Sequence, residues 1–182
     1  MYLNTGLPDV EQASALGLVD DAVPLPESGQ LFRAIAGHPS SMSPLSEWAR
    51  ELSDLHAALI PSQCGTPVQP TGSDCGQIRH AIGRVVEEID EWAARYLPRP
   101  KSARKHTHSL GEVIAHIARA YAEAWWLVLR ARDEEVRHEA WFHTGEAIEG
   151  YSEMVKEIKA RNLRLPLGSA RIQAGESASG MR

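Results

Sequence analysis

Residues 74–96, DCGQIRHAIGRVVEEIDEWAARY, decide the fold of this chain. Large apolar residues recur there every three or four positions, which is the spacing of one face of an α-helix: Ile78, Ile82, Val85, Ile89, Trp92 and Tyr96. The pattern Asp74-x-x-Gln77 before this stripe resembles a capping box, and Pro98 behind it stops a helix. The segment therefore predicts one amphipathic helix over residues 74–96.

Two more segments on the C-terminal side have the same helical spacing. The first begins at a second capping box, Ser109-x-x-Glu112, and its apolar stripe comprises Leu110, Val113, Ile114, Ile117, Tyr121, Ala124, Trp125 and Val128. The second begins near Asp133, and its stripe comprises Val136, Ala140, Ala147, Tyr151, Met154 and Ile158. Both segments predict long amphipathic helices.

Two shorter helices are predicted on the N-terminal side. The first covers residues 30–36, with Ser28 as its N-cap and Gly37 as its stop. The second opens at Pro44, a residue well tolerated at the first helical position, and ends at Pro61. Its apolar stripe comprises Leu45, Trp48, Leu52, Leu55 and Leu59.

No β-hairpin pattern is present, and every long periodic segment has the helical period. The sequence therefore predicts an all-α bundle with three long antiparallel amphipathic helices and two shorter N-terminal ones. We expect a single bundle domain over residues 29–166, preceded by an extended arm over residues 1–28. The Gly/Ser/Ala-rich residues 167–182 are expected to form a disordered tail.

The overall composition excludes several classes of protein. A chain of 182 residues is about the size of one domain and can bury a core without a metal or a disulfide. A net charge of −5 argues against a nucleic-acid partner, and no apolar run approaches the ~20 residues of a membrane span. We expect a cytoplasmic protein without a cofactor, in which Cys64 and Cys75 are reduced thiols.

A basic segment over residues 95–108 is the first candidate site. It runs without an acid into the start of the helix that begins at Leu110, where free N–H groups and the positive end of the helix dipole favour anions. The candidate anion-binding residues are Arg99, Lys101, Arg104, Lys105, His106 and His108. Their ligand would be a phosphate-bearing small molecule, a carboxylate or an acidic protein partner. The alternative is a solvated basic linker.

Carboxylate–histidine pairs offer a metal site as a less favoured interpretation. Glu112 and His116, and likewise Glu139 and His143, are spaced to share one face of a helix. At 100° per residue, however, Glu112 and His116 point away from the apolar stripe, which favours a solvated charged face. A metal-dependent hydrolase would need these faces buried by oligomerisation, and the acidic stretch at residues 87–91 lacks a partner acidic helix.

Two tryptophans suggest an interface with another chain. Trp125 and Trp126 lie 100° apart on a helix, so both cannot face one core, and Trp126 falls near Arg130 on the polar side. Large exposed aromatic residues are typical of interfaces, so Trp126 and Trp141 are the interface candidates of a homo-oligomer. The alternative is a tryptophan lying flat over an arginine side chain.

Residues 30–166 also contain a set of short motifs in a fixed order: Leu55-His56, Ile89-Asp90-x-Trp92, His106-Thr107-x-Ser109-Leu110-Gly111, His138-x-Ala140-Trp141, Gly150-Tyr151-x-x-Met154 and Arg164-Leu165-Pro166. In this order the chain resembles a family of actinobacterial all-helical proteins that is classed as a domain of unknown function. The resemblance implies a helical fold. It brings no reaction, substrate or cofactor.

Three functional hypotheses follow from the sequence. The leading one is a non-enzymatic helical bundle that acts through protein contacts, as an oligomer. The second is a protein, or an enzyme, that binds an anion or a phosphate-bearing small molecule at residues 95–108 and at the start of the next helix. The third is the metal-dependent hydrolase that would use Glu112, His116, Glu139 and His143.

Overall fold

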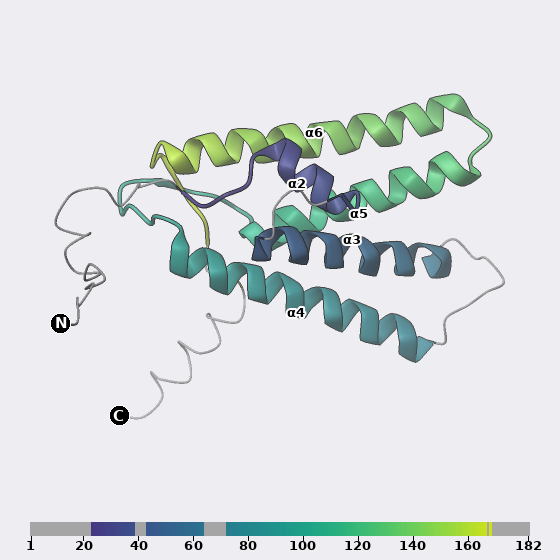
Figure 1. The fold of residues 1–182 in the computed structure, drawn as a ribbon, viewed down its shortest axis with the longest axis horizontal. Helices are drawn as coiled ribbons and strands as arrows, with labels where there is room; N and C mark the ends of the chain where they lie inside the picture. The colour runs from purple at the N-terminus through teal and green to yellow at the C-terminus, as the bar shows by residue number, and fades with distance from the viewer. Residues whose placement is uncertain (1–22, 39–42, 64–71, 167, 169–182) are drawn as a thin grey trace, which may run out of the picture.

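The computed structural model describes residues 23–38, 43–63, 72–166 and 168, and this part of the chain is mostly helical (Figure 1). Its helices are α2 (Ser28–Ile35), α3 (Pro44–Gln63), α4 (Gly72–Tyr96), α5 (Leu110–Arg130) and α6 (Glu134–Lys159). Two short strands, β1 (Arg104–Lys105) and β2 (Leu163–Arg164), pair in parallel. The all-α class is confirmed.

The four long helices pack together, with α2 lying against α3 and α6 (Figure 1). Helices α3 and α4 run in opposite directions, as do α5 and α6, whereas α3 and α5 run side by side in the same direction. Helix α5 is central, because it packs against α3, α4 and α6. One of the two helices expected to be short, α3, has 20 residues. The described residues therefore form four long helices and a short one.

The core collects the inward faces of all five described helices. Its largest fully buried side chains include Leu31, Leu45, Leu52, Ile89, Leu110, Ile114, Ile117, Tyr151 and Ile158. The buried Tyr151 hydroxyl donates to the Pro26 carbonyl oxygen at 2.9 Å, which fixes the segment before α2 to α6. Burial raises the pKa of Tyr151, so this hydroxyl stays protonated and can act as a donor.

Three of the predicted helix ends are wrong by a few residues. Helix α2 has Glu27 as its N-cap, not Ser28, because Glu27 and the Gln30 side chain form a reciprocal capping box. Helix α3 continues beyond Pro61 to Gln63, since a proline so close to a helix end disturbs only the last turn. Helix α4 begins at Gly72, so Asp74 lies inside it and is not its N-cap.

Other predicted ends are confirmed by their hydrogen bonds. Gly37 ends α2 with a φ of 87° and lies in a Schellman motif. In this motif the His38 N–H donates to the Arg33 carbonyl oxygen at 2.7 Å. The Ser109 hydroxyl accepts from Glu112 N–H at 3.2 Å, while the Glu112 carboxylate accepts from Ser109 N–H at 2.8 Å. This is the capping box that the sequence predicts for α5.

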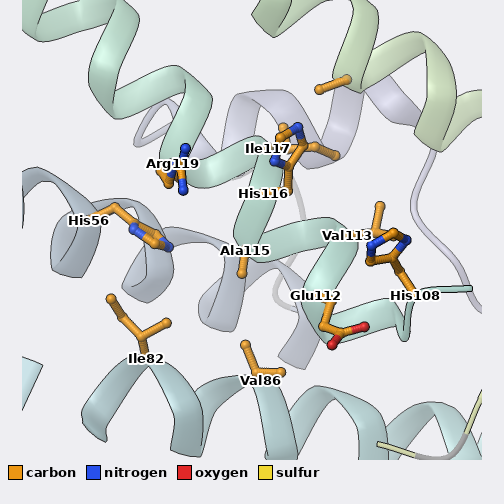
Figure 2. A pocket seen from close by; sticks show the side chains of 11 residues that line it. His56, Ile82, Val86, His108, Glu112, Val113, Ala115, His116, Ile117 and Arg119 are labelled. Carbon is orange, nitrogen blue, oxygen red and sulfur yellow. The ribbon is translucent and has the colours of Figure 1, made fainter. Parts of the chain in front are cut away.

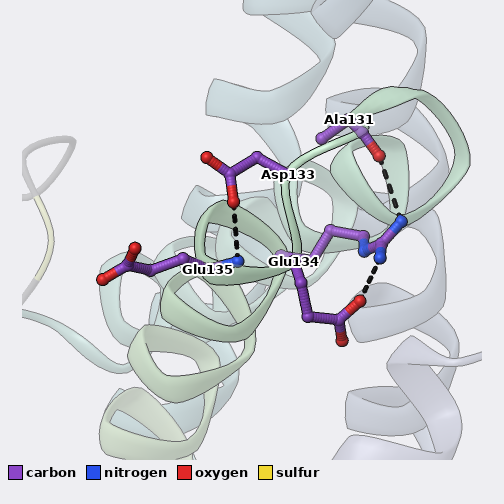
Figure 3. Close-up of polar contacts among 5 residues, drawn as sticks. Ala131, Asp133, Glu134 and Glu135 are labelled. Carbon is purple, nitrogen blue, oxygen red and sulfur yellow. Dashed lines mark hydrogen bonds and ion pairs between the residues drawn. The ribbon is translucent and has the colours of Figure 1, made fainter.

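The turn between α5 and α6 is held by its own side chains (Figure 3). Helix α6 begins near Asp133, as predicted; Asp133 is its N-cap, and its Oδ1 accepts from Glu135 N–H at 2.9 Å. The Arg137 guanidinium pairs with Glu134 and also donates to the Ala131 carbonyl at 3.1 Å. These bonds join residues of the turn to one another.

Several predictions fall on residues outside the described part of the chain. These are the arm, of which only residues 23–28 are described, the tail apart from Gly168, and Cys64. Cys75 is a half-buried free thiol. Within the described residues, no helix is both long and apolar enough to cross a membrane.

Candidate functional site

The start of α5, predicted to offer free N–H groups to an external anion, is already occupied by the chain's own polar groups. The capping box engages the N–H groups of Ser109 and Glu112. The N–H of Gly111 donates to Asp90 Oδ1 of α4 at 2.8 Å. At this helix end a carboxylate from a neighbouring helix therefore takes the place that an external anion would need, and the anion site over residues 95–108 stays a prediction.

Asp90 is a buried carboxylate that the sequence reasoning missed. Only 7% of the residue is exposed. Burial raises the pKa of Asp90, while hydrogen bonds from the Ser109 hydroxyl and from Gly111 N–H act in the opposite direction. Asp90 appears in the sequence only within a family motif and the acidic stretch at residues 87–91, and neither identifies its partner on α5.

Gly111 lets α5 approach α4 closely enough for this contact. A Cβ at Gly111 would lie 2.4 Å from the backbone oxygen of Val86 and 3.0 Å from Asp90 Oδ1. Any side chain would therefore push the two helices apart. The position beside Gly111 and Asp90 is thus a packing and capping joint, and it leaves no room for a ligand.

The six candidate residues of the basic segment have different contacts in the structure. Arg99 donates to the Leu165 carbonyl oxygen at 3.3 Å, so it helps to hold the segment after α6. Arg104 and Lys105 form β1, and their side chains are exposed, as is that of Lys101. His106 Nδ1 lies 2.8 Å from the backbone oxygen of His108. His108, exposed at the start of α5, borders the hollow described next.

A hollow of about 490 Å³ lies over the outer face of α5 (Figure 2). Helix α3 contributes one lining residue, α4 two and α6 one, and the others lie on α5 or just before it. The lining residues are His56, Ile82, Val86, His108, Glu112, Val113, Ala115, His116, Ile117, Arg119 and Ala147. We call this cavity the α5 hollow.

His56 forms the α3 side of the α5 hollow, and the sequence analysis named it only as part of a family motif. Burial, together with the positive charge of Arg119, lowers the pKa of His56 from 6.5 to about 4. The imidazole is therefore neutral at neutral pH. Its buried Nε2 has no hydrogen-bond partner among the described residues. A half-buried neutral histidine with unused hydrogen-bonding capacity is typical of binding sites.

Glu112, His116 and Arg119 lie on the exposed face of α5, as the helical spacing predicts. They are not simply a solvated charged face, because all three border the α5 hollow. Arg119 Nε pairs with Glu123 Oε1 at 3.0 Å. That pair uses one of the five N–H donors of the guanidinium, so the others can serve a ligand.

The four metal-ligand candidates are divided between two places. Glu112 and His116 border the α5 hollow, whereas Glu139 and His143 lie in the first turns of α6. There, His143 Nδ1 lies 3.0 Å from Glu146 Oε2, and its Nε2 lies 3.8 Å from Glu139 Oε1. Within the described residues, no three His, Cys, Asp or Glu side chains gather as metal ligands would.

The C-terminal end of α5 and the N-terminal end of α6 form a second notable surface. We call residues 125–143 the hairpin end; none of them is buried. Four of the five large apolar residues that are exposed in the described chain lie here: Trp125 at 50%, Leu129 at 68%, Val136 at 39% and Phe142 at 59%. The fifth is Tyr96, which is 52% exposed.

The two interface candidates, Trp126 and Trp141, are each half-buried within this region. Trp126 lies under the Arg130 guanidinium, 5.7 Å from the ring centroid, which is the cation–π arrangement considered as the alternative. Trp141 packs edge-on against Tyr121 at 5.8 Å. The more exposed aromatic residues are their chain neighbours, Trp125 and Phe142.

Comparison of the chain with family models, with curated proteins and with solved structures found no match.

Proposed function

We propose that this protein is a non-enzymatic helical module that associates with a second copy of itself through the hairpin end. The observation that carries the proposal is the concentration of exposed apolar side chains there. Trp125 and Leu129 lie four residues apart on one face of α5, and taking about half of each side chain as uncovered, they leave on the order of 200 Å² of apolar surface in water. Exposed clusters of large apolar side chains are often interaction sites.

The helical hairpin itself favours a second copy as the partner. Within one protomer, α3 and α4 already pack against α5, so a second copy would add its own hairpin end alongside the residues that stay uncovered here. A two-fold contact places the same surface against itself. The hairpin end suits such a contact because it has both signs of charge, with acids at Asp133, Glu134, Glu135 and Glu139 and arginines at Arg130, Arg132 and Arg137. A surface of one sign would repel its own copy.

The mass of the protein in solution tests this proposal. Size-exclusion chromatography with light scattering at about 100 μM should give a dimer for the wild type and a monomer for the Trp125→Ala/Leu129→Ala variant. Tyr96→Ala is the matched control, because Tyr96 is as exposed as Trp125 but lies on another helix. It should remain dimeric. Circular dichroism checks that each variant keeps its helices.

A wild-type monomer at this concentration overturns the proposal. So does a double variant that keeps the dimer mass, since the contact then lies elsewhere. On the same proposal the protein acts in the cytoplasm, where Cys75 remains a thiol. The resemblance to the actinobacterial helical family over residues 30–166 is compatible with a contact module, because it implies a fold and no reaction.

A further inference from the structure

The α5 hollow is separate from the hairpin end and has the composition of a ligand site. Its volume of about 490 Å³ is in the range typical of small-molecule pockets. Apolar side chains from two walls, Ile82 and Val86 of α4 and Val113 and Ile117 of α5, offer a surface for an apolar group. The small side chain of Ala115 points toward Ile82 and Val86 and leaves space beside them (Figure 2).

We propose that the α5 hollow binds a small organic anion, with an apolar body against Ile82 and Val86 and a carboxylate or phosphate group near Arg119 and His116. The proposal is independent of self-association through the hairpin end. It also differs from the anion site predicted at the start of α5, where Asp90 and the capping box already occupy the N–H groups.

The polar side chains around the hollow explain why its ligand is anionic. Arg119 carries a permanent positive charge and has N–H donors beyond the Nε that pairs with Glu123. His108 and His116 add two exposed imidazoles that can donate hydrogen bonds. The acid that lines the hollow, Glu112, has Oε2 engaged by Ser109 N–H at 2.8 Å. The rim therefore offers more donors than acceptors to a ligand.

His56 adds a polar but uncharged wall. Because its imidazole is neutral at neutral pH, it contributes no charge of its own beside Arg119. Its Nε2 is buried and lacks a partner among the described residues, which is energetically costly. A ligand group that reaches this nitrogen, directly or through a water molecule, would recover part of that cost.

Calorimetric titration of the full chain tests the proposal with four probes. The probes are 4-phenylbutyrate, phenyl phosphate, the uncharged 4-phenylbutanol and inorganic phosphate. We expect at least one of the two aromatic anions to bind with a dissociation constant at or below about 1 mM. We expect 4-phenylbutanol and inorganic phosphate to bind at least about tenfold more weakly, because each lacks one half of the recognised chemistry.

Variants then locate the site. Arg119→Gln/His116→Gln should weaken binding of the aromatic anion about tenfold, and Ala115→Phe should abolish it by filling the space between the walls. Arg84→Gln is the matched control: Arg84 is 59% exposed against 60% for Arg119, and each pairs with a glutamate four residues later. It should bind like the wild type.

Each contrary result is decisive. If neither aromatic anion binds, or if 4-phenylbutanol binds as tightly, the site does not recognise an anion and the proposal is overturned. Equal weakening by Arg84→Gln would mean that general surface charge, and not the α5 hollow, attracts the probe. The tighter binder of 4-phenylbutyrate and phenyl phosphate shows whether the hollow prefers a carboxylate or a phosphate group. All these residues lie outside the hairpin end, so a failure here leaves the dimer mass unchanged.

Discussion

The two halves of the α5–α6 pair have similar sequence patterns but different environments. In the inner half, α5 up to Ala124 and α6 from Thr144 onward, the apolar stripes are buried. In the hairpin end, the same stripes continue through Trp125, Leu129 and Val136, and none of these residues is buried. Helical spacing therefore gives the direction of a side chain, while burial depends on whether another element lies on that side.

The interactions that hold the two halves also differ. The inner half is held by packing with α3 and α4 and by the close approach at Gly111. The hairpin end is held by local polar bonds of Asp133 and Arg137 across its turn (Figure 3). Substitutions should consequently act strongly in the inner half and weakly, as long as the protein is a monomer, in the hairpin end.

The largest effect is expected at the joint between α4 and α5. Gly111→Ala should lower the free energy of unfolding by about 3 kcal/mol or more, because its Cβ would lie 2.4 Å from the Val86 oxygen. Urea denaturation measures the loss. Gly83→Ala is the control, since a Cβ there meets nothing within 4 Å, and it should be neutral or stabilising by up to about 1 kcal/mol. Equal stability of the two variants would mean that the joint is not tight.

Truncation of one apolar residue in each half compares them directly. Ile117→Ala should cost about 2–4 kcal/mol, because Ile117 is 1% exposed and its loss leaves a cavity. Leu129→Ala should change the stability of the monomer by less than about 0.5 kcal/mol, since Leu129 is 68% exposed. Both are measured by urea denaturation at a concentration where light scattering finds the monomer. Similar losses would show that the hairpin end is covered after all.

The buried carboxylate of the inner half gives an intermediate effect. Asp90→Ala should cost about 2 kcal/mol, because the buried Gly111 N–H loses its acceptor. Asp90→Asn keeps an acceptor oxygen of the same shape and should cost less than half as much. Thermal denaturation of the two variants separates the hydrogen bond from the charge. If Asn is as harmful as Ala, the contribution of Asp90 comes from its charge.

The smallest effect concerns pH. Because the pKa of His56 is about 4 in the folded protein against 6.5 ordinarily, the unfolded chain takes up a proton first as the pH falls. The associated stability is present above pH 6.5 and is lost as the pH falls toward 4. Between pH 7.5 and 5.0, the wild type should lose about 1 kcal/mol more than His56→Phe, a figure reduced for solvent screening. Denaturation curves of both proteins at both pH values measure these losses. Identical losses for the wild type and His56→Phe would mean that the imidazole is solvated in the folded protein.

The sequence predicted the helices better than the candidate site. The capping box of Ser109 and Glu112 and the start of α6 near Asp133 were predicted correctly because they rely on residues a few positions apart. Asp90 and His56 were missed because their environments are created by α5, which is distant in sequence. The predicted metal ligands shared helix faces within each pair, yet the tertiary structure placed the two pairs at different ends of the α5–α6 hairpin.

The sequence by itself determined that this protein is helical, where most of its helices begin and end, and which side of α5 carries Glu112, His116 and Arg119. These properties follow from local spacing and local hydrogen bonds. Only the tertiary structure decided that the start of α5 is capped by Asp90, that the charged side of α5 borders a hollow, and that Trp125 is exposed. Burial and desolvation depend on which helices, distant in sequence, pack against each other, and the residues of one helix alone do not specify that packing.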